Sequence, residues 1–135
     1  MPSIDVNYWA VLVAAAFNMA LGAFWYSPNG FGKQWSKLTG VSNDDMKARG
    51  NTGMALSLAG ALIMAFVLAH FVRYAGSVSF ADGLVNGFWL WTAFIAVTMA
   101  GMYVFEGRSW KLWQINAGYY LVVLLVTGGL LAAWR

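Results

Sequence analysis

Long apolar segments separated by polar connections dominate the chain. Four such segments, which we expect to be helices, lie at approximately Tyr8–Tyr26, Thr52–Tyr74, Gly83–Phe105 and Leu112–Trp134. A helix rises about 1.5 Å per residue, so roughly 20 residues cross a hydrocarbon core about 30 Å thick. Each segment reaches that length, and none carries a charged residue near its middle. The pattern predicts an all-α integral membrane protein, a four-helix transmembrane bundle that forms a single domain over residues 1–135.

Ser27–Asn51 is the longest polar connection, and its pattern is partly helical. Phe31, Trp35 and Leu38 recur at the i, i+4, i+7 spacing, with lysines placed between them to face water. An amphipathic helix of this kind lies flat at a membrane surface. We therefore expect a short interfacial helix here.

A second short helix is expected later in the same connection. Ser42 and Asn43 are both candidate N-cap residues. Asp44–Arg49 then places its acidic residues early and its basic residues late, which complements the helix dipole. We expect Gly50 to end this helix.

Small residues recur at every fourth position in the second apolar segment, at Gly53, Ser57, Ala61, Ala65 and Ala69. In lipid, small residues let helix backbones approach closely and gain dispersion contacts. We interpret this stripe as packing within the bundle in preference to a dedicated dimer contact. Because four spans make a thin bundle, we still expect a homo-oligomer.

The composition agrees with a lipid environment. The chain is 61% hydrophobic and 10% charged, whereas a soluble domain has about a quarter of its residues charged. Membrane lipids are therefore the expected partners. The chain has no cysteine and one histidine, which excludes disulfides, thiolate sites and a multi-histidine cluster within one chain, so we expect neither a metal nor a cofactor.

The basic residues predict an orientation. Six of the 8 lysine and arginine residues lie in the first and third connections: Lys33, Lys37, Lys47, Arg49, Arg108 and Lys111. The positive-inside rule then places these connections in the cytoplasm and both termini on the outer, periplasmic side of the cell (inner) membrane. This distribution points to membrane orientation and not to nucleic-acid binding. Met1–Asn7 has no lysine or arginine, so we expect no cleavable signal peptide.

Polar residues within the apolar segments are candidates for function. Asn18 lies near the centre of the first segment, where an unpaired amide is costly, so it should face the interior. It is either a ligand-binding or proton-relay group or a partner in an interhelical hydrogen bond. His70 and Asp82 flank the second connection and form a candidate proton-linked pair, or they simply end helices at the interface.

The first turns of the fourth segment form the most polar cluster on the predicted inner face. Its members are Gln114, Asn116, Tyr119 and Tyr120, with Glu106 and Arg108 just before them. This cluster is either a binding pocket at headgroup level or a helix entrance with a surface ion pair. Trp89 and Trp91 lie deeper in the third segment, where we expect them to pack between helices.

Several motifs resemble one family. They are the segments 1–8, 25–28, 31–35, 87–91, 105–110 and 115–119, together with Asn18 and Gly22. The chain is similar over nearly its whole length to an uncharacterised bacterial membrane family, domain of unknown function 1761. The resemblance implies a small four-helix membrane protein and supplies no reaction, substrate or cofactor. It also implies that the regions around Asn18, Trp25–Trp35 and Glu106–Tyr119 form the recurrent pattern of the family.

The leading functional hypothesis is a self-associating, non-enzymatic membrane protein that binds a lipid or small amphiphile at the cytoplasmic interface. The alternative is a small oligomeric transporter or channel with Asn18 lining its path. A lipid-modifying enzyme is the weakest hypothesis, because no catalytic constellation is present. The candidate ligand-binding residues are Asn18, Trp25, Tyr26, Lys33, Trp35, Glu106, Arg108, Trp110, Asn116, Tyr119 and Tyr120.

Overall fold

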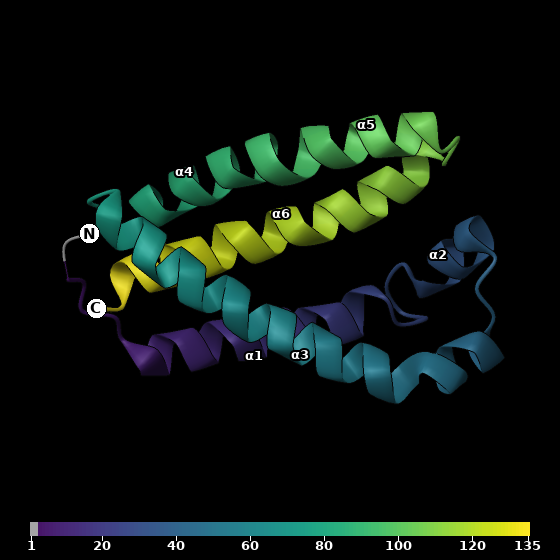
Figure 1. Ribbon diagram of the computed structural model, residues 1–135, viewed down its shortest axis with the longest axis horizontal. Coiled ribbons are helices and arrows are strands. Elements are labelled where there is room, and N and C mark those ends of the chain that lie inside the picture. The colour runs from purple at the N-terminus through teal and green to yellow at the C-terminus, as the bar shows by residue number, and fades with distance from the viewer. Residues whose placement is uncertain (1–2) are drawn as a thin grey trace.

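A computed structural model describes residues 3–135 of the chain (Figure 1). Its helices are α1 (Tyr8–Trp25), α2 (Gly32–Thr39), α3 (Asn43–Tyr74), α4 (Phe80–Trp91), the π-helical segment η1 (Thr92–Ala96), α5 (Val97–Phe105) and α6 (Trp110–Ala133). Four helices are long and apolar enough to cross a membrane: α1, α3, the continuous α4–η1–α5, and α6. The predicted all-α class with four spans is confirmed. Met1 and Pro2, part of the expected domain and of the family resemblance, lie outside the described residues.

The spans run alternately in opposite directions (Figure 1). Both chain ends and the turn between α3 and α4 lie at one end of the bundle, which we call the terminal end. The α1–α2 connection, α2, the start of α3 and the turn between α5 and α6 lie at the other end. We call this the basic end, because six of the 8 lysine and arginine residues belong to it.

The helices begin and end at clear sequence signals. Ser42 accepts a hydrogen bond from the Asp45 amide, and the Asp45 carboxylate accepts one from the Ser42 amide, so α3 starts with a capping box. Ser79 and Asp82 make the same two bonds at the start of α4. Gly107 follows α5 with φ of 67°, a left-handed conformation that favours glycine. These caps satisfy backbone groups that would otherwise lack partners at the helix ends.

The second short helix expected over Asp44–Arg49 is not a separate element. Gly50 does not end it, and the helix continues as α3 for 32 residues from Asn43 to Tyr74. A single glycine costs a helix only about 1 kcal/mol relative to alanine, and no proline follows it here. At about 1.5 Å per residue, α3 is about 48 Å long, which exceeds the hydrocarbon thickness. The charged first turns of α3 therefore extend beyond its most apolar stretch.

α6 is the central helix of the bundle. In the most apolar 18-residue stretch of α6, 56% of the residues are buried. The corresponding stretches of α1, α3 and Phe80–Phe105 have 28%, 28% and 11% of their residues buried. Ala61, Ala65 and Ala69 on α3 are buried in the core with α1, as the small-residue stripe predicts. Gly53 and Ser57, at the start of the same stripe, are exposed.

The helices α4 and α6 approach each other closely enough for their backbones to touch. A Cβ atom built on Gly83 would overlap the carbonyl of Gly128, and one on Gly87 would overlap the carbonyl of Leu124. Only glycine permits this separation, because its missing side chain lets backbone touch backbone. The two glycines that make this contact are spaced as Gly83-x-x-x-Gly87, a motif typical of close helix packing in membranes that was not among the predictions.

Indole groups make further contacts between the helices. Trp91 Nε1 donates to the Ala117 carbonyl of α6 over 2.7 Å, and Trp113 Nε1 donates to the Ala96 carbonyl of η1 over 3.0 Å. A π-helical segment is rare and disturbs the regular helical hydrogen bonds, and here one of its carbonyls accepts an indole N–H. The prediction for Trp91 is confirmed. That for Trp89 is wrong, because its side chain is 64% exposed.

We expect Gly87→Ala to lower the free energy of unfolding by about 1–3 kcal/mol, the usual cost of overpacking. The added methyl group would push the α4 backbone away from Leu124. Equilibrium unfolding in detergent or bicelles measures the change. Gly101→Ala in α5 is the control, because a Cβ there meets no atom within 4 Å. A Gly87→Ala variant as stable as the Gly101→Ala variant would contradict the close contact.

Candidate functional site

The chain reverses tightly between α1 and α2 at the basic end. The Phe31 amide donates to the Trp25 carbonyl over 2.6 Å. A Cβ on Gly30 or Gly32 would overlap backbone carbonyls of residues 24–27, so only glycine fits these positions. The reversal brings α2 beside the first turns of α6 and places the rings of Phe31 and Trp25 4.8 Å apart between their centroids.

Asn18 is held between three helices. It is 7% exposed, and Tyr119 of α6 donates its hydroxyl to the Asn18 carbonyl over 2.9 Å while also contacting its side-chain oxygen. The Asn18 amide nitrogen lies 3.9 Å from the sulfur of Met64 on α3. Gly22 leaves room for Tyr119, since a Cβ there would lie 3.1 Å from the hydroxyl. This geometry favours the interhelical hydrogen bond among the interpretations of Asn18.

A second polar connection joins α1, α6 and α5. Tyr26 donates its hydroxyl to Asn116 Oδ1 over 2.8 Å, and Asn116 Nδ2 donates to the Tyr103 hydroxyl over 2.8 Å. Beside it, Trp25 Nε1 donates to the Ile115 carbonyl over 2.9 Å. Both groups of the Asn116 amide are therefore used, and the end of α1 is fixed against α6.

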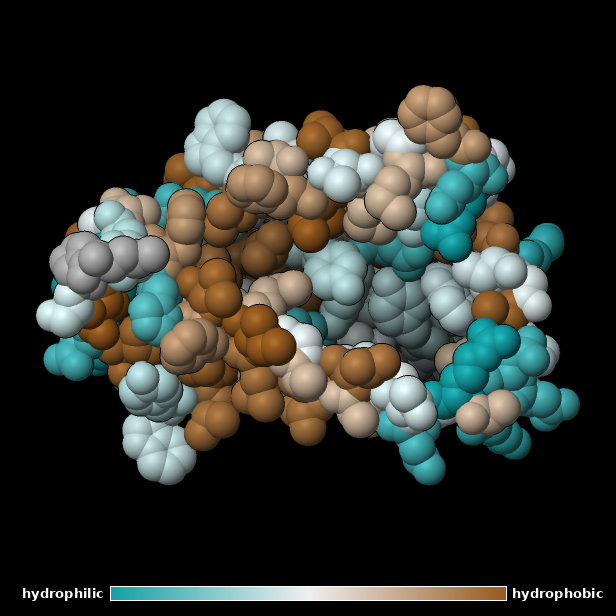
Figure 2. Space-filling model, viewed as in Figure 1, coloured by the Kyte–Doolittle hydropathy of each residue, from teal (hydrophilic) through white to brown (hydrophobic). Residues whose placement is uncertain are grey.

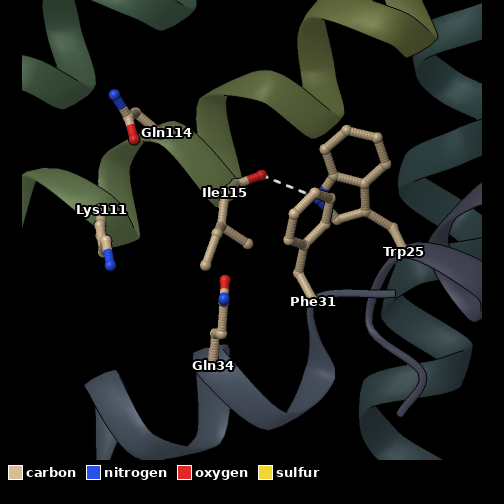
Figure 3. A pocket seen from close by; sticks show the side chains of 6 residues that line it. All are labelled: Trp25, Phe31, Gln34, Lys111, Gln114 and Ile115. Carbon is tan, nitrogen blue, oxygen red and sulfur yellow. Dashed lines mark hydrogen bonds between the residues drawn. The ribbon is translucent and has the colours of Figure 1, made fainter. Parts of the chain in front are cut away.

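Two cavities flank the contact between α2 and α6. The first, which we call the lysine cavity, has a volume of about 280 Å³ and is lined by Trp25, Phe31, Gln34, Lys111, Gln114 and Ile115. Figure 3 shows the Gln34 side chain rising from α2 and the Lys111 side chain reaching from α6 into the same gap, while the Gln114 amide points away from α2. The lysine cavity thus combines one cation, amide groups and aromatic rings.

The second cavity, which we call the methionine cavity, has a volume of about 340 Å³. It is lined by Tyr26, Trp35, Met46, Met99, Asn116 and Tyr120. Figure 2 shows the surface hollowed toward the basic end, with apolar side chains over the terminal half and hydrophilic ones around the rim at the basic end. Both cavities are thus built at the end where the sequence places its cations and amides.

The remaining charged candidates lie at the surface of the basic end. Arg108 Nε lies 3.3 Å from Glu106 Oε2 in a half-exposed ion pair, and its guanidinium carbon lies 4.9 Å from the centroid of the Tyr103 ring. Lys33 is exposed on α2. Trp110 is 59% exposed and stacks on Trp113 with ring centroids 4.3 Å apart. None of Lys33, Glu106, Arg108 and Trp110 lines either cavity.

His70 and Asp82 have separate partners near the terminal end. His70 Nδ1 lies 2.8 Å from the Phe66 carbonyl. The Asp82 carboxylate accepts hydrogen bonds from the amides of Val78 and Ser79, each over 3.0 Å. Their proton-linked role stays a prediction. Within residues 3–135, no group of three or more His, Cys, Asp or Glu side chains is placed to hold a metal ion.

The structure brings together seven of the predicted ligand-binding residues on the α1–α2–α6 contact: Asn18, Trp25, Tyr26, Trp35, Asn116, Tyr119 and Tyr120. Met46, Met99, Tyr103 and Ile115 also take part and were not among the candidates. Met46 and Met99 belong to α3 and α5, and no local pattern indicates that these two helices face one cavity. Tyr103 had a usable signal, since an aromatic hydroxyl in the last turn of α5 comes back beside the first turns of α6 after a short connection.

The four apolar helices and the polar contacts between them define a multi-pass helical membrane protein. The sequence profile of the family described as Protein of unknown function (DUF1761) matches residues 9–132. The chain belongs to that family, as its motifs predict. No curated protein and no solved structure matches the chain.

We expect Tyr119→Phe to destabilise the protein by about 0.6–2 kcal/mol, the range for interhelical hydrogen bonds in membranes. The change removes the hydroxyl that Asn18 accepts from and leaves the ring in place. Thermal unfolding in detergent checks it. Tyr120→Phe is the control, because the Tyr120 hydroxyl has no hydrogen-bond partner within residues 3–135. Equal melting temperatures for the two variants would argue against the Asn18–Tyr119 contact.

Proposed function

We propose that this protein binds a lipid or related amphiphile with an anionic head in the lysine cavity, and that it self-associates in the membrane. The observation that supports binding is the set of groups converging there: a cation at Lys111, the Gln34 amide, and the rings of Trp25 and Phe31. A site at the level where apolar spans meet charged connections suits a molecule with an apolar body and a charged head.

Each group has a distinct chemical part in this proposal. The Lys111 ammonium offers three donors to a phosphate or carboxylate, and its long stem lets the charge reach the interface. The Gln34 amide can donate to the same head or accept from its hydroxyl groups. Trp25 and Phe31 provide an apolar wall, and the Trp25 ring is held by its hydrogen bond to the Ile115 carbonyl.

The oligomeric transporter or channel stays a hypothesis. Asn18, the residue expected to line its path, is buried and bonded to Tyr119. An amide with protein partners supports helix packing more directly than it supports a water-filled route. The lipid-modifying enzyme likewise has no specific observation in its favour.

We expect Lys111→Gln to lower retention of an anionic lipid about 5-fold, since one basic residue near a membrane surface contributes about 1 kcal/mol to anionic-lipid binding. Native mass spectrometry of the full chain, after exchange into phosphatidylglycerol or phosphatidylcholine, measures the bound lipid. Lys37→Gln is the matched control, because Lys37 is an exposed lysine of α2 that does not line the cavity. Equal losses in both variants would mean that net charge, and not the lysine cavity, retains the lipid.

Self-association is proposed at the first half of α3. Residues 51–60 are all exposed, and Gly53, Ser57 and Gly60 share one helical face there. Small residues on an uncovered face let a second helix approach closely.

We expect Ser57→Leu to lower the dimer fraction in bilayers, counted by single-molecule photobleaching, because its side chain would separate the two backbones. Ala55→Leu adds a side chain of the same size to the opposite face and should leave the dimer fraction unchanged. A monomeric unmodified protein, or equal effects of the two variants, would refute this contact.

A further inference from the structure

We propose that the methionine cavity is a second binding site, and that it takes a weakly hydrated organic cation such as a trimethylammonium group. This goes beyond the anionic ligand of the lysine cavity. The observation that carries the proposal is a pocket walled by three aromatic rings and two thioethers, with no charged side chain among its lining residues.

The aromatic walls are suited to a cation. Tyr26, Trp35 and Tyr120 line the cavity from α1, α2 and α6. The Tyr26 and Trp35 ring centroids lie 6.0 Å apart at 75°, so the edge of one ring meets the face of the other. Aromatic faces carry a negative quadrupole, and cages of such rings recognise quaternary ammonium groups.

The other lining residues narrow the ligand class. Met46 and Met99 contribute soft, polarizable sulfur atoms that pack against methyl groups. A hard inorganic cation requires several oxygen ligands, commonly carboxylates, and the lining has none. An anion would lack a cationic partner there. A cation whose charge is spread over methyl groups needs neither carboxylate ligands nor a charged partner.

The cavity wall is held in place before any ligand arrives. Tyr26 donates to Asn116, and Asn116 donates to Tyr103, which fixes the Tyr26 ring against α6. The Arg108 guanidinium lies over the ring of Tyr103 and is paired with Glu106, so it is held outside the cavity. The same end of the bundle thus already holds one cation against a tyrosine face.

The size and position of the cavity fit a separate site. Its volume of about 340 Å³ lies at the lower end of the range for small-molecule sites, about 300–1,000 Å³. It shares no lining residue with the lysine cavity. Three pairs of consecutive residues are split between the cavities: in Trp25–Tyr26, Gln34–Trp35 and Ile115–Asn116, the first residue lines the lysine cavity and the second lines the methionine cavity. The two cavities therefore lie on either side of one contact between α2 and the α1–α6 pair.

Calorimetric titration of the full chain in neutral maltoside micelles tests the proposal. The probes are phenylethyltrimethylammonium and its neutral analogue, in which a tert-butyl group replaces the trimethylammonium. A cation–aromatic contribution of this kind should make the neutral analogue bind roughly 3- to 30-fold more weakly. Equal affinities for the two probes, or no binding of the cation, would overturn the proposal.

Paired variants then locate the site. Tyr120→Phe keeps the ring and should bind the cation as the unmodified protein does, whereas Tyr120→Leu should bind it roughly 3- to 30-fold more weakly. The same comparison is made on α2, where Trp35→Phe keeps an aromatic ring and should bind the cation more tightly than Trp35→Leu. If one variant misfolds, the other pair still tests the site. Trp89→Leu, on an exposed face of α4, is the control.

The two sites can fail independently. Lys111→Gln should weaken retention of the anionic lipid and leave cation affinity unchanged. Loss of cation binding in Lys111→Gln, or full affinity in both leucine variants, would place the cation elsewhere and refute this site. Absence of anionic-lipid retention with cation binding intact would refute the proposed function alone.

Discussion

The contact between the backbones of α4 and α6 is the constraint on which the bundle depends. In lipid, apolar surface gives helices little reason to associate, so close packing and hydrogen bonds must hold them together. Gly83 and Gly87 face the carbonyls of Gly128 and Leu124 with no side chain between them. This pairs α4 with the second half of α6 and leaves the other sides of α6 free for α1 and α3. As a result α6 is the central helix, and 56% of the residues in its most apolar stretch are buried.

Hydrogen bonds also hold α1 and the end of α4 against α6, and their acceptors are main-chain carbonyls. A chain with 10% charged residues offers few polar side chains to pair with. Trp25 and Trp91 instead donate to main-chain carbonyls of α6, at Ile115 and Ala117. A carbonyl oxygen has two lone pairs, so it can keep its helical bond and accept an indole N–H as well. These partly buried indoles therefore find partners without adding polar side chains to the membrane interior.

The sequence predicted the spans, because their length and apolar composition are properties of local segments. It also predicted that Asn18 faces the interior of the bundle, since an unpaired amide is costly in hydrocarbon. It misplaced the end of the charged helix at Gly50, where a glycine within a strong helix is simply tolerated. It could not assign Met46 and Met99 to one cavity, because their meeting depends on how three other helices cross. The glycine contact between α4 and α6 was not predicted, although the Gly83-x-x-x-Gly87 spacing is present in the sequence.

The positions of the cavities follow from an asymmetry in side-chain size along α6. Toward the terminal end α6 carries Gly128 and Gly129, and α4 lies directly against it. Toward the basic end it carries Trp113, Tyr119 and Tyr120, whose rings pack against other aromatic rings. There α5 and α2 lie less extensively against α6 than α4 does at the terminal end. Cavities therefore remain at the end where the cations and amides also gather, and Tyr120 of α6 lines one of them.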